Sequence, residues 1–425
     1  MASTPAPVTA TERIATLDIL RAFALLGIIT VNMYMFSHPF QNYLLPASSP
    51  LPWYDQLATW FVHMFTEGKF YPLFSLLFGL GFALQLERAQ ARGGSFVPLY
   101  LRRLLVLLSF GLIHAYLIWI GDILTIYALL GGFLLLFARV KQPRTLLIWA
   151  AVFWTILQLG SFALAGLIEW GRTIPEAAVQ IEASFEQQNA IFAAERERAL
   201  VAYGSGNFAE VTAQRARDLQ TVWTGSIAMV PMIMTMFLIG AYLGRQGVFR
   251  DLEAHRPLFR RLAIWGFAIG LPANLIATVM FTQVGRTEIG WSLAIANFFL
   301  SLGGLSQSLG YLGAVTLLSQ RAPWDRYLAR LAPVGQMGLT NYLLQSIIAT
   351  LIFYGYGLGF FNQVGVAAGL LLAVTIYALQ IPLSHWWMAR FRYGPAEWLW
   401  RSLTYLRPQP MRREPKTVGT LQRPA

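Results

Sequence analysis

The chain has 425 residues, of which 56% are hydrophobic, 14% aromatic and 12% charged. Soluble globular proteins carry about 25% charged residues, so this chain has too little polar surface for a water-soluble fold. A mean hydropathy of +0.51 is typical of an integral membrane protein. The absence of cysteine excludes disulfides, thiolate nucleophiles and cysteine-bound metals.

The net charge of +12 would suit a nucleic-acid-binding protein, but basic residues in a membrane protein mark its cytoplasmic side. Apolar runs of helix-spanning length recur along the chain, rather than the alternating ten-residue segments of a membrane barrel. We therefore predict an all-α, polytopic membrane helix bundle that contacts the lipid bilayer and has no nucleic-acid partner.

The first apolar run, residues 13–36, is long enough to cross a bilayer yet contains Asp18, Arg21 and Asn32 near one helix face. A charge in lipid costs about 2.5–3.5 kcal/mol, so this face is expected to contact protein or water. Asp18 and Arg21 fit either a local ion pair or an arginine that meets an anionic ligand. Asn32 fits either helix–helix bonding or a cavity.

Nine further spans follow from the apolar runs, and segment 53–65 is expected to be interfacial or re-entrant. Most of the 32 Lys and Arg residues fall on one side if both termini are cytoplasmic, which predicts ten spans in that orientation. The further spans are expected near residues 69–86, 101–120, 123–137, a run ending at 168, 223–244, 260–281, 291–318, 333–354 and 364–388.

This pattern predicts five regions. They are a disordered N-terminus (1–12), a membrane half with five spans (13–168), an extracytoplasmic helical segment (169–222), a second half with five spans (223–388), and a cytoplasmic interfacial helix with a disordered tail (389–425).

His114 and Asp122 are the strongest candidates for chemistry. His114 lies about 18 Å along its span from Arg102, and Asp122 follows at the outer bend. A neutral imidazole can exchange a proton near pH 7, and a carboxylate can orient it. The alternative is an interior hydrogen-bonded histidine and an aspartate that caps the next helix. Lys69 flanks the outer end of the second span, as an interfacial anchor or a group at a cavity mouth.

Soluble-enzyme motifs are missing from the sequence. It contains no Gly-rich phosphate loop, no HExxH, no GxSxG and no paired carboxylates at glycosidase-like spacing.

Five motifs occur in the order in which the YeiB-like family has them, and the chain resembles that family over nearly its whole length. They are TLDILRAFALLGIITVNM, GKFYPLFSLLFGLG, GLIHAYLIWIGDILTIYALLG, VGQMGLTNYLLQS and YGPAEWLWRSLTY. The resemblance implies a multi-span protein of the bacterial cytoplasmic (inner) membrane, with a domain of unknown function in its C-terminal part.

The pattern LDILRAFALLG, followed by Asn32, also resembles the first helix of transmembrane acyltransferases, including heparan-α-glucosaminide N-acetyltransferase. That likeness implies that the protein transfers an acyl group from a cytoplasmic acyl-CoA co-substrate to a sugar or lipid-linked acceptor across the membrane. It implies no permanently bound cofactor. The sugar O-acyltransferases have a catalytic histidine where this chain has Asn32. The candidate general base in this chain is therefore His114.

On this hypothesis Arg21, Arg102 and Arg103 would meet the donor's phosphates. His114 would act as general base or briefly carry the acyl group, and Asp122 would fix its tautomer. Asn32 would hydrogen-bond the oxyanion. Two alternatives stay open: a small-molecule transporter with the same polar path, and a non-catalytic component that docks a partner through 169–222.

Overall fold

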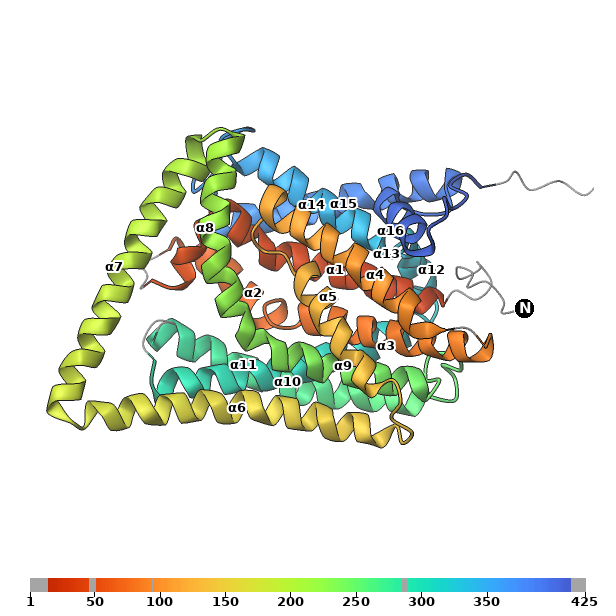
Figure 1. The fold of residues 1–425 in the computed structure, drawn as a ribbon, viewed down its shortest axis with the longest axis horizontal. Helices are drawn as coiled ribbons and strands as arrows, with labels where there is room; N and C mark the ends of the chain where they lie inside the picture. The colour runs from red at the N-terminus through yellow and green to blue at the C-terminus, as the bar shows by residue number, and fades with distance from the viewer. Residues whose placement is uncertain (1–13, 46–50, 94, 285–288, 414–425) are drawn as a thin grey trace, which may run out of the picture.

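The computed structural model describes residues 14–45, 51–93, 95–284 and 289–413, and in these ranges it is helical without a β-strand (Figure 1). This confirms the predicted all-α class. The elements are α1 (Ala15–Ser37), η1 (Phe40–Tyr43), α2 (Trp53–Phe65), α3 (Phe70–Ala91), α4 (Phe96–Ile113), η2 (His114–Ile118), α5 (Leu124–Phe133), η3 (Leu134–Phe137), α6 (Arg144–Arg172), α7 (Pro175–Ser205), α8 (Phe208–Ser226), η4 (Ile227–Met229), α9 (Val230–Arg245), α10 (Arg256–Val284), α11 (Trp291–Leu318), α12 (Trp324–Ala329), α13 (Ala332–Gln336), α14 (Gly338–Phe353), α15 (Val366–Arg390) and α16 (Pro395–Tyr405).

Eight helical stretches of the described chain are long and apolar enough to cross a bilayer, so the protein is a multi-pass membrane protein. Two shorter apolar helices, Leu124–Phe137 and Gly338–Phe353, coincide with the predicted fourth and ninth spans. The total of ten spans and the cytoplasmic termini stay predictions. The eight long stretches are Ala15–Ser37, Trp53–Ala91, Phe96–Ile118, Arg144–Arg172, Phe208–Arg245, Arg256–Thr282, Trp291–Leu318 and Val366–Arg390.

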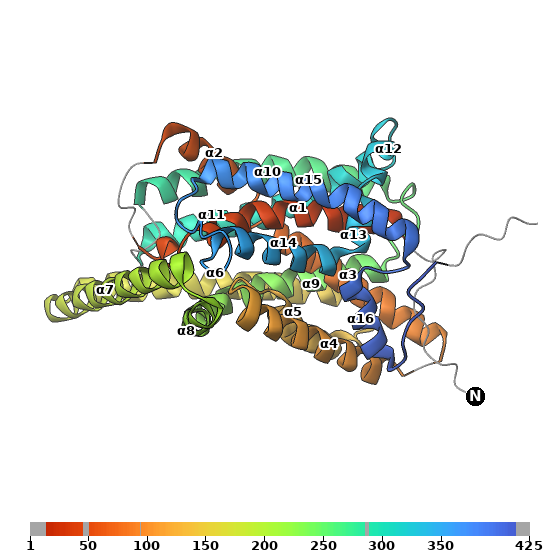
Figure 2. The same cartoon turned by 90° about the horizontal axis from the view of Figure 1, so that it is seen from above.

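Helix α1 lies in the middle of the bundle, with α3, α13, α14 and α15 packed against it (Figure 2). Most of its side chains are buried, including the carboxylate of Asp18. The contact with α13 depends on a glycine, because a Cβ on Gly335 would lie 1.8 Å from the Asp18 carbonyl oxygen. The chain therefore brings α13, which begins the VGQMGLTNYLLQS motif, directly against the polar part of α1.

The second crossing is interrupted in the middle. Residues 66–69 separate α2 from α3, and Gly68 makes the turn with a φ of +76°. The interruption meets the middle of two other helices: a Cβ on Gly304 of α11 would touch the Gly68 carbonyl, and one on Gly27 of α1 would touch Phe70. Lys69 is therefore the N-cap residue of α3 and lies in the turn that packs beside the middle of α1 and α11.

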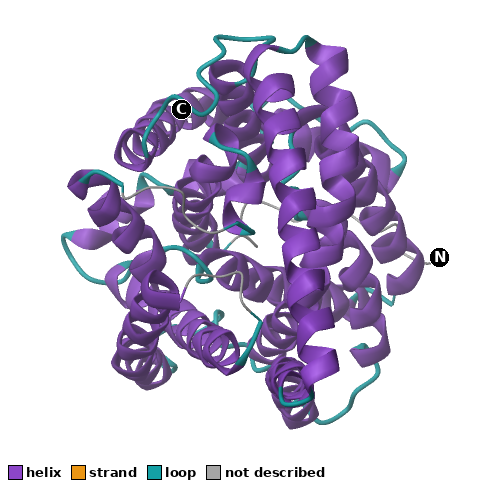
Figure 3. Cartoon of the chain, turned by 90° about the vertical axis from the view of Figure 1, so that its left-hand side faces the viewer, coloured by secondary structure: helices purple, strands orange, loops and turns teal. Residues whose placement is uncertain are grey.

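The segment between the two membrane halves forms a helical hairpin. Helix α6 extends to Arg172, α7 runs obliquely away from it, and α8 returns to the bundle (Figure 1). Asn207 and Glu210 form a capping box that starts α8. Figure 3, seen from the side on which α7 lies, shows helices and loops only. Helix α8 packs on η2, where the Arg215 guanidinium donates to the Tyr116 carbonyl at 2.9 Å.

Candidate functional site

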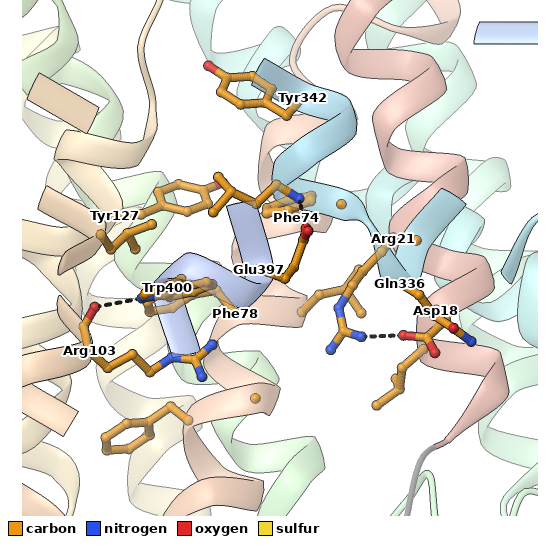
Figure 4. A pocket seen from close by; sticks show the side chains of 18 of the residues that line it. Asp18, Arg21, Phe74, Phe78, Arg103, Tyr127, Gln336, Tyr342, Glu397 and Trp400 are labelled. Atoms are coloured by element: carbon orange, nitrogen blue, oxygen red, sulfur yellow. Dashed lines mark hydrogen bonds and ion pairs between the residues drawn. The ribbon is translucent and has the colours of Figure 1, made fainter. Parts of the chain in front are cut away.

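A cavity of about 290 Å³ lies inside the bundle, between α1, α3, α4, α5, α14 and α16. Its lining includes Arg88 and Tyr405, which lie near the ends of α3 and α16. Figure 4 shows Tyr342 of α14 on the opposite side of the cavity from Arg103 and Asp18. In the predicted orientation these helix ends face the cytoplasm. The cavity is therefore placed to receive a molecule from the side on which most basic residues are expected.

Positive charge exceeds negative charge around this cavity. Four arginines line it (Arg21, Arg88, Arg103 and Arg401), against two carboxylates, Asp18 and Glu397. Asp18 is already used, because its Oδ1 accepts from Arg21 Nη1 at 2.7 Å. The remaining positive charge favours an anionic ligand.

Glu397 has a structural task as well. Its carboxylate accepts hydrogen bonds from the backbone N–H of Leu339, at 2.6 Å, and of Thr340, at 3.1 Å, at the start of α14. Burial raises the pKa of this carboxyl above its ordinary value, although the bonds from Thr340 and Leu339 act in the opposite direction. Glu397 therefore anchors α16 to α14 and leaves the arginines as the main charged groups for a ligand.

Arginine and aromatic side chains are combined at the α16 side. The Arg103 guanidinium carbon lies 4.1 Å from the centre of the Trp400 ring, and Trp400 Nε1 donates to the Arg103 carbonyl at 2.9 Å. Farther in, the lining is apolar and aromatic, with Phe74, Phe78 and Tyr127 among its members. A charged entrance and an apolar interior fit an amphiphilic ligand with an anionic head.

Behind the inner end of the cavity lies a buried hydrogen-bonded chain of three side chains. His114 Nδ1 is 2.9 Å from Asp122 Oδ1, and His114 Nε2 is 2.9 Å from Ser346 Oγ. His114 is fully buried, and Ser346 and Asp122 are 1% and 5% exposed. Asp122 also accepts from the backbone N–H of Leu124 and Thr125, at 3.2 and 2.7 Å, so it caps α5 as well.

Tyr342 separates this chain from the cavity. Its ring centre is 5.0 Å from that of His114, and it lies one helical turn before Ser346 on α14. Ile123 and Leu124, which follow Asp122, also line the cavity. The chain Asp122–His114–Ser346 therefore lies beside the inner end of the cavity, and η2, which begins with His114, also contacts α8 of the hairpin.

The structure brings some of the predicted site residues together and not others. Asp18, Arg21 and Arg103 line the cavity, and His114 and Asp122 meet behind its inner end. Arg102 points elsewhere, since its Nη1 donates to the Thr404 carbonyl at 3.1 Å.

Two further predicted residues stand apart from this site. Lys69 is fully buried at the interruption between α2 and α3, where its Nζ donates to the His63 carbonyl. His63 in turn contacts Glu67. Asn32 is half-buried and is not among the cavity-lining residues, and its side-chain amide hydrogen-bonds no group in the described ranges. The roles of Lys69 and Asn32 toward a substrate stay predictions.

Ser346 is the principal functional candidate that sequence reasoning missed. The residues that the cavity adds are Arg88, Tyr342, Glu397 and Arg401. The only sequence signal for these residues was that they belong to two of the five ordered motifs or to the basic loop after the second span. In the described ranges, no three His, Cys, Asp or Glu side chains are grouped in a way that would hold a metal ion.

Comparison with known proteins shows relatives of the same length. The uncharacterized protein YxaH of Bacillus subtilis is 36% identical, over 96% of this chain and 98% of YxaH. The uncharacterized protein YeiB of Escherichia coli is 31% identical, over 92% of this chain and 96% of YeiB. The chain belongs to the YeiB-like family. Residues 243–407 match a family model described as a protein of unknown function, DUF418.

In this YeiB-like protein the DUF418 region supplies only part of the site. Tyr342, Ser346 and Glu397 lie inside residues 243–407, whereas Arg21 and His114 precede them. The cavity and the buried chain are therefore assembled from both membrane halves. No solved structure matches the fold.

Proposed function

We propose that this protein is a membrane-embedded acyltransferase of the bacterial inner membrane. It takes an acyl group from an acyl-CoA-type donor in the cytoplasm and passes it to a hydroxyl or amine on a sugar or lipid-linked acceptor on the other side. The observation that carries this proposal is the position of the His114–Asp122 pair behind Tyr342, which lines the inner end of a cavity that four arginines also line.

The cavity supports the donor half of the proposal. A CoA-type donor has phosphates at one end and an acyl group at the other. Arginines bind phosphate strongly because the guanidinium donates two parallel hydrogen bonds. Arg103 and Arg401 would hold the phosphates, and the aromatic interior beyond Phe78 would hold the acyl end.

The buried pair supports the transfer half. A neutral histidine whose Nδ1 is held by a carboxylate has its other ring nitrogen free to accept a proton from a nucleophile. Asp122 holds His114 in this way, with 2.9 Å between His114 Nδ1 and Asp122 Oδ1. The pair would serve as the general base as the acyl carbonyl is attacked.

The test measures donor binding and turnover in reconstituted vesicles. We expect saturable binding of acyl-CoA from the α16 side, weakened about 10-fold or more in R103Q, because a lost charge-assisted bond is worth about 1.5–3 kcal/mol. The matched control is R261Q, an exposed arginine on α10. Equal binding by wild type and R103Q would remove the cavity from the donor site, and absence of binding would reject the function.

The interrupted α2–α3 crossing favours a second candidate, a small-molecule transporter. Broken helices that meet at mid-membrane are typical of transporter binding sites, and this one holds the buried Lys69. Net flux of an unmodified solute through the vesicles, without acyl transfer, would favour this candidate.

A further inference from the structure

The hydrogen bonds around Asp122 decide which atom of the buried chain donates to which. The Asp122 carboxylate accepts from two backbone N–H groups, so it acts as an acceptor toward the ring as well. His114 Nδ1 must then carry the ring proton. His114 Nε2 is left with its lone pair, and among the described residues its partner is Ser346 Oγ at 2.9 Å. The Ser346 hydroxyl therefore donates its proton to the imidazole.

In this bond Ser346 differs from Ser37 and Ser308, two other buried serines of the bundle. The hydroxyls of Ser37 and Ser308 donate to the carbonyl four residues earlier, at 2.9 and 2.6 Å. That is the usual bond of a helical serine. In Ser346 the corresponding carbonyl, that of Tyr342, is 3.4 Å away, which is longer than the bond to His114.

We propose that Ser346 is the nucleophile of a buried Ser–His–Asp relay and carries the acyl group between donor and acceptor. This inference rests on the proposed function for its natural substrate. The arrangement has the general form of an activated serine: a nucleophile bonded to a base, and the base oriented by a third group. It also divides one transfer across a membrane into two shorter steps.

In the first step Ser346 Oγ attacks the thioester carbonyl, and its proton moves to His114 Nε2. The C–O bond forms, the C–S bond breaks, and the proton passes from Nε2 to the leaving thiolate. In the second step the acceptor hydroxyl or amine attacks the ester and gives its proton to Nε2. The bond between the acyl carbon and Ser346 Oγ then breaks, and the proton returns to the serine.

The position of Ser346 fits an intermediate reached from both sides. On one side it is a single helical turn from Tyr342, where the cavity ends. On the other side η2, which begins with His114, is covered by α8 of the hairpin. In this proposal a donor carbonyl in the cavity reaches the hydroxyl by displacing the Tyr342 ring, which lines the cavity and lies 5.0 Å from the His114 ring.

The first test uses a fluorophosphonate with an alkyl chain, which labels activated serines whatever their natural substrate. We expect mass spectrometry of the protein in vesicles to find the label on Ser346. The rate is expected to fall about 10²–10⁴-fold in H114Q, the usual contribution of a general base. S308A, which alters a buried serine bonded only to backbone carbonyls, is expected to label like wild type. No label on Ser346, or the same rate in H114Q, would overturn the proposal.

The second test uses the natural absence of cysteine from the chain. In S346C the new thiol would face His114, which favours its thiolate. A small thiosulfonate forms a mixed disulfide with a thiolate and releases sulfinate, so we expect S346C to react at pH values well below the ordinary thiol pKa of about 8.5. S308C is the matched control and is expected to react only at higher pH. The same pH dependence in both variants, or no effect of adding H114Q to S346C, would contradict the relay.

These outcomes separate the inference from the proposed function. Acyl transfer that persists in S346A would reject the serine intermediate and leave the acyltransferase standing. Labelling of Ser346 without transfer from any acyl-CoA would reject the acyltransferase and leave the nucleophile.

Discussion

At the scale of single residues, Asp122 has two roles that one substitution can separate. It caps α5 and it orients His114. Asn is also a good N-cap residue, so D122N should change the free energy of unfolding by no more than about 1 kcal/mol. The amide would favour the wrong imidazole tautomer, and turnover should fall about 10⁴-fold. Melting in detergent together with an acyl-transfer assay checks both parts. Equal losses of stability and activity would make Asp122 a structural residue only.

Glu397 predicts a pH dependence of stability. Because burial raises its pKa, the folded protein holds this proton more tightly than the unfolded chain does. The resulting stabilisation is fully present below the ordinary glutamate pKa of about 4.3, and it is lost as the pH rises through the raised pKa. We expect the melting temperature of wild type to decline over this window and that of E397Q to decline less. E253Q, an exposed glutamate, serves as the control. Identical pH profiles for wild type and E397Q would contradict the assignment.

At the scale of elements, the close contact between α13 and α1 sets the position of the cavity wall. G335A would place a methyl group 1.8 Å from the Asp18 carbonyl oxygen, so the two helices must separate. Overpacking of this kind typically costs about 1–3 kcal/mol. G160A, on α6 with no heavy atom within 4 Å of the added group, should be neutral or slightly stabilising. Thermal melting of both variants tests the contact, and a G335A protein as stable as G160A would refute it.

Most elements could be predicted from sequence because each apolar run specifies its own helix. The position of the α2–α3 interruption could not, since residues 66–69 contain the ordinary turn residue Gly68 and nothing local gives their depth. The position of these residues within the bundle is fixed by contacts with α11, where the Ser308 hydroxyl donates to the Lys69 carbonyl. Such contacts join residues far apart in the chain, so no sequence window contains them.

At the scale of the whole molecule, contacts between residues far apart in the chain also limited how much of the site could be predicted from sequence. The pairing of His114 with Asp122 lay within one short segment, and the polar groups of α1 lay within another. Ser346 is 232 residues from His114, and only packing of α14 against η2 joins them. The cavity likewise needs α16 beside α4, a contact between helices almost 300 residues apart, as the bond from Trp400 to the Arg103 carbonyl shows.

The orientation of the whole molecule gives a prediction that uses the cysteine-free sequence. In intact cells, a membrane-impermeant maleimide should label Q187C on α7, whereas R407C beyond α16 should react only after permeabilisation. Both side chains are exposed, so accessibility of the membrane face decides the result. The opposite pattern would place the arginine-rich entrance outside the cell.

The most direct test of the account places donor and acceptor on opposite sides of one membrane. Vesicles with a single protein orientation would receive acyl-CoA labelled in its acyl group on the α16 side, and hexosamines on the α7 side. We predict labelled hexosamine on the α7 side, at a rate that H114A and S346A reduce to background and S308A does not. Absence of product, or transfer only when donor and acceptor share one compartment, would contradict an acyl relay through this bundle.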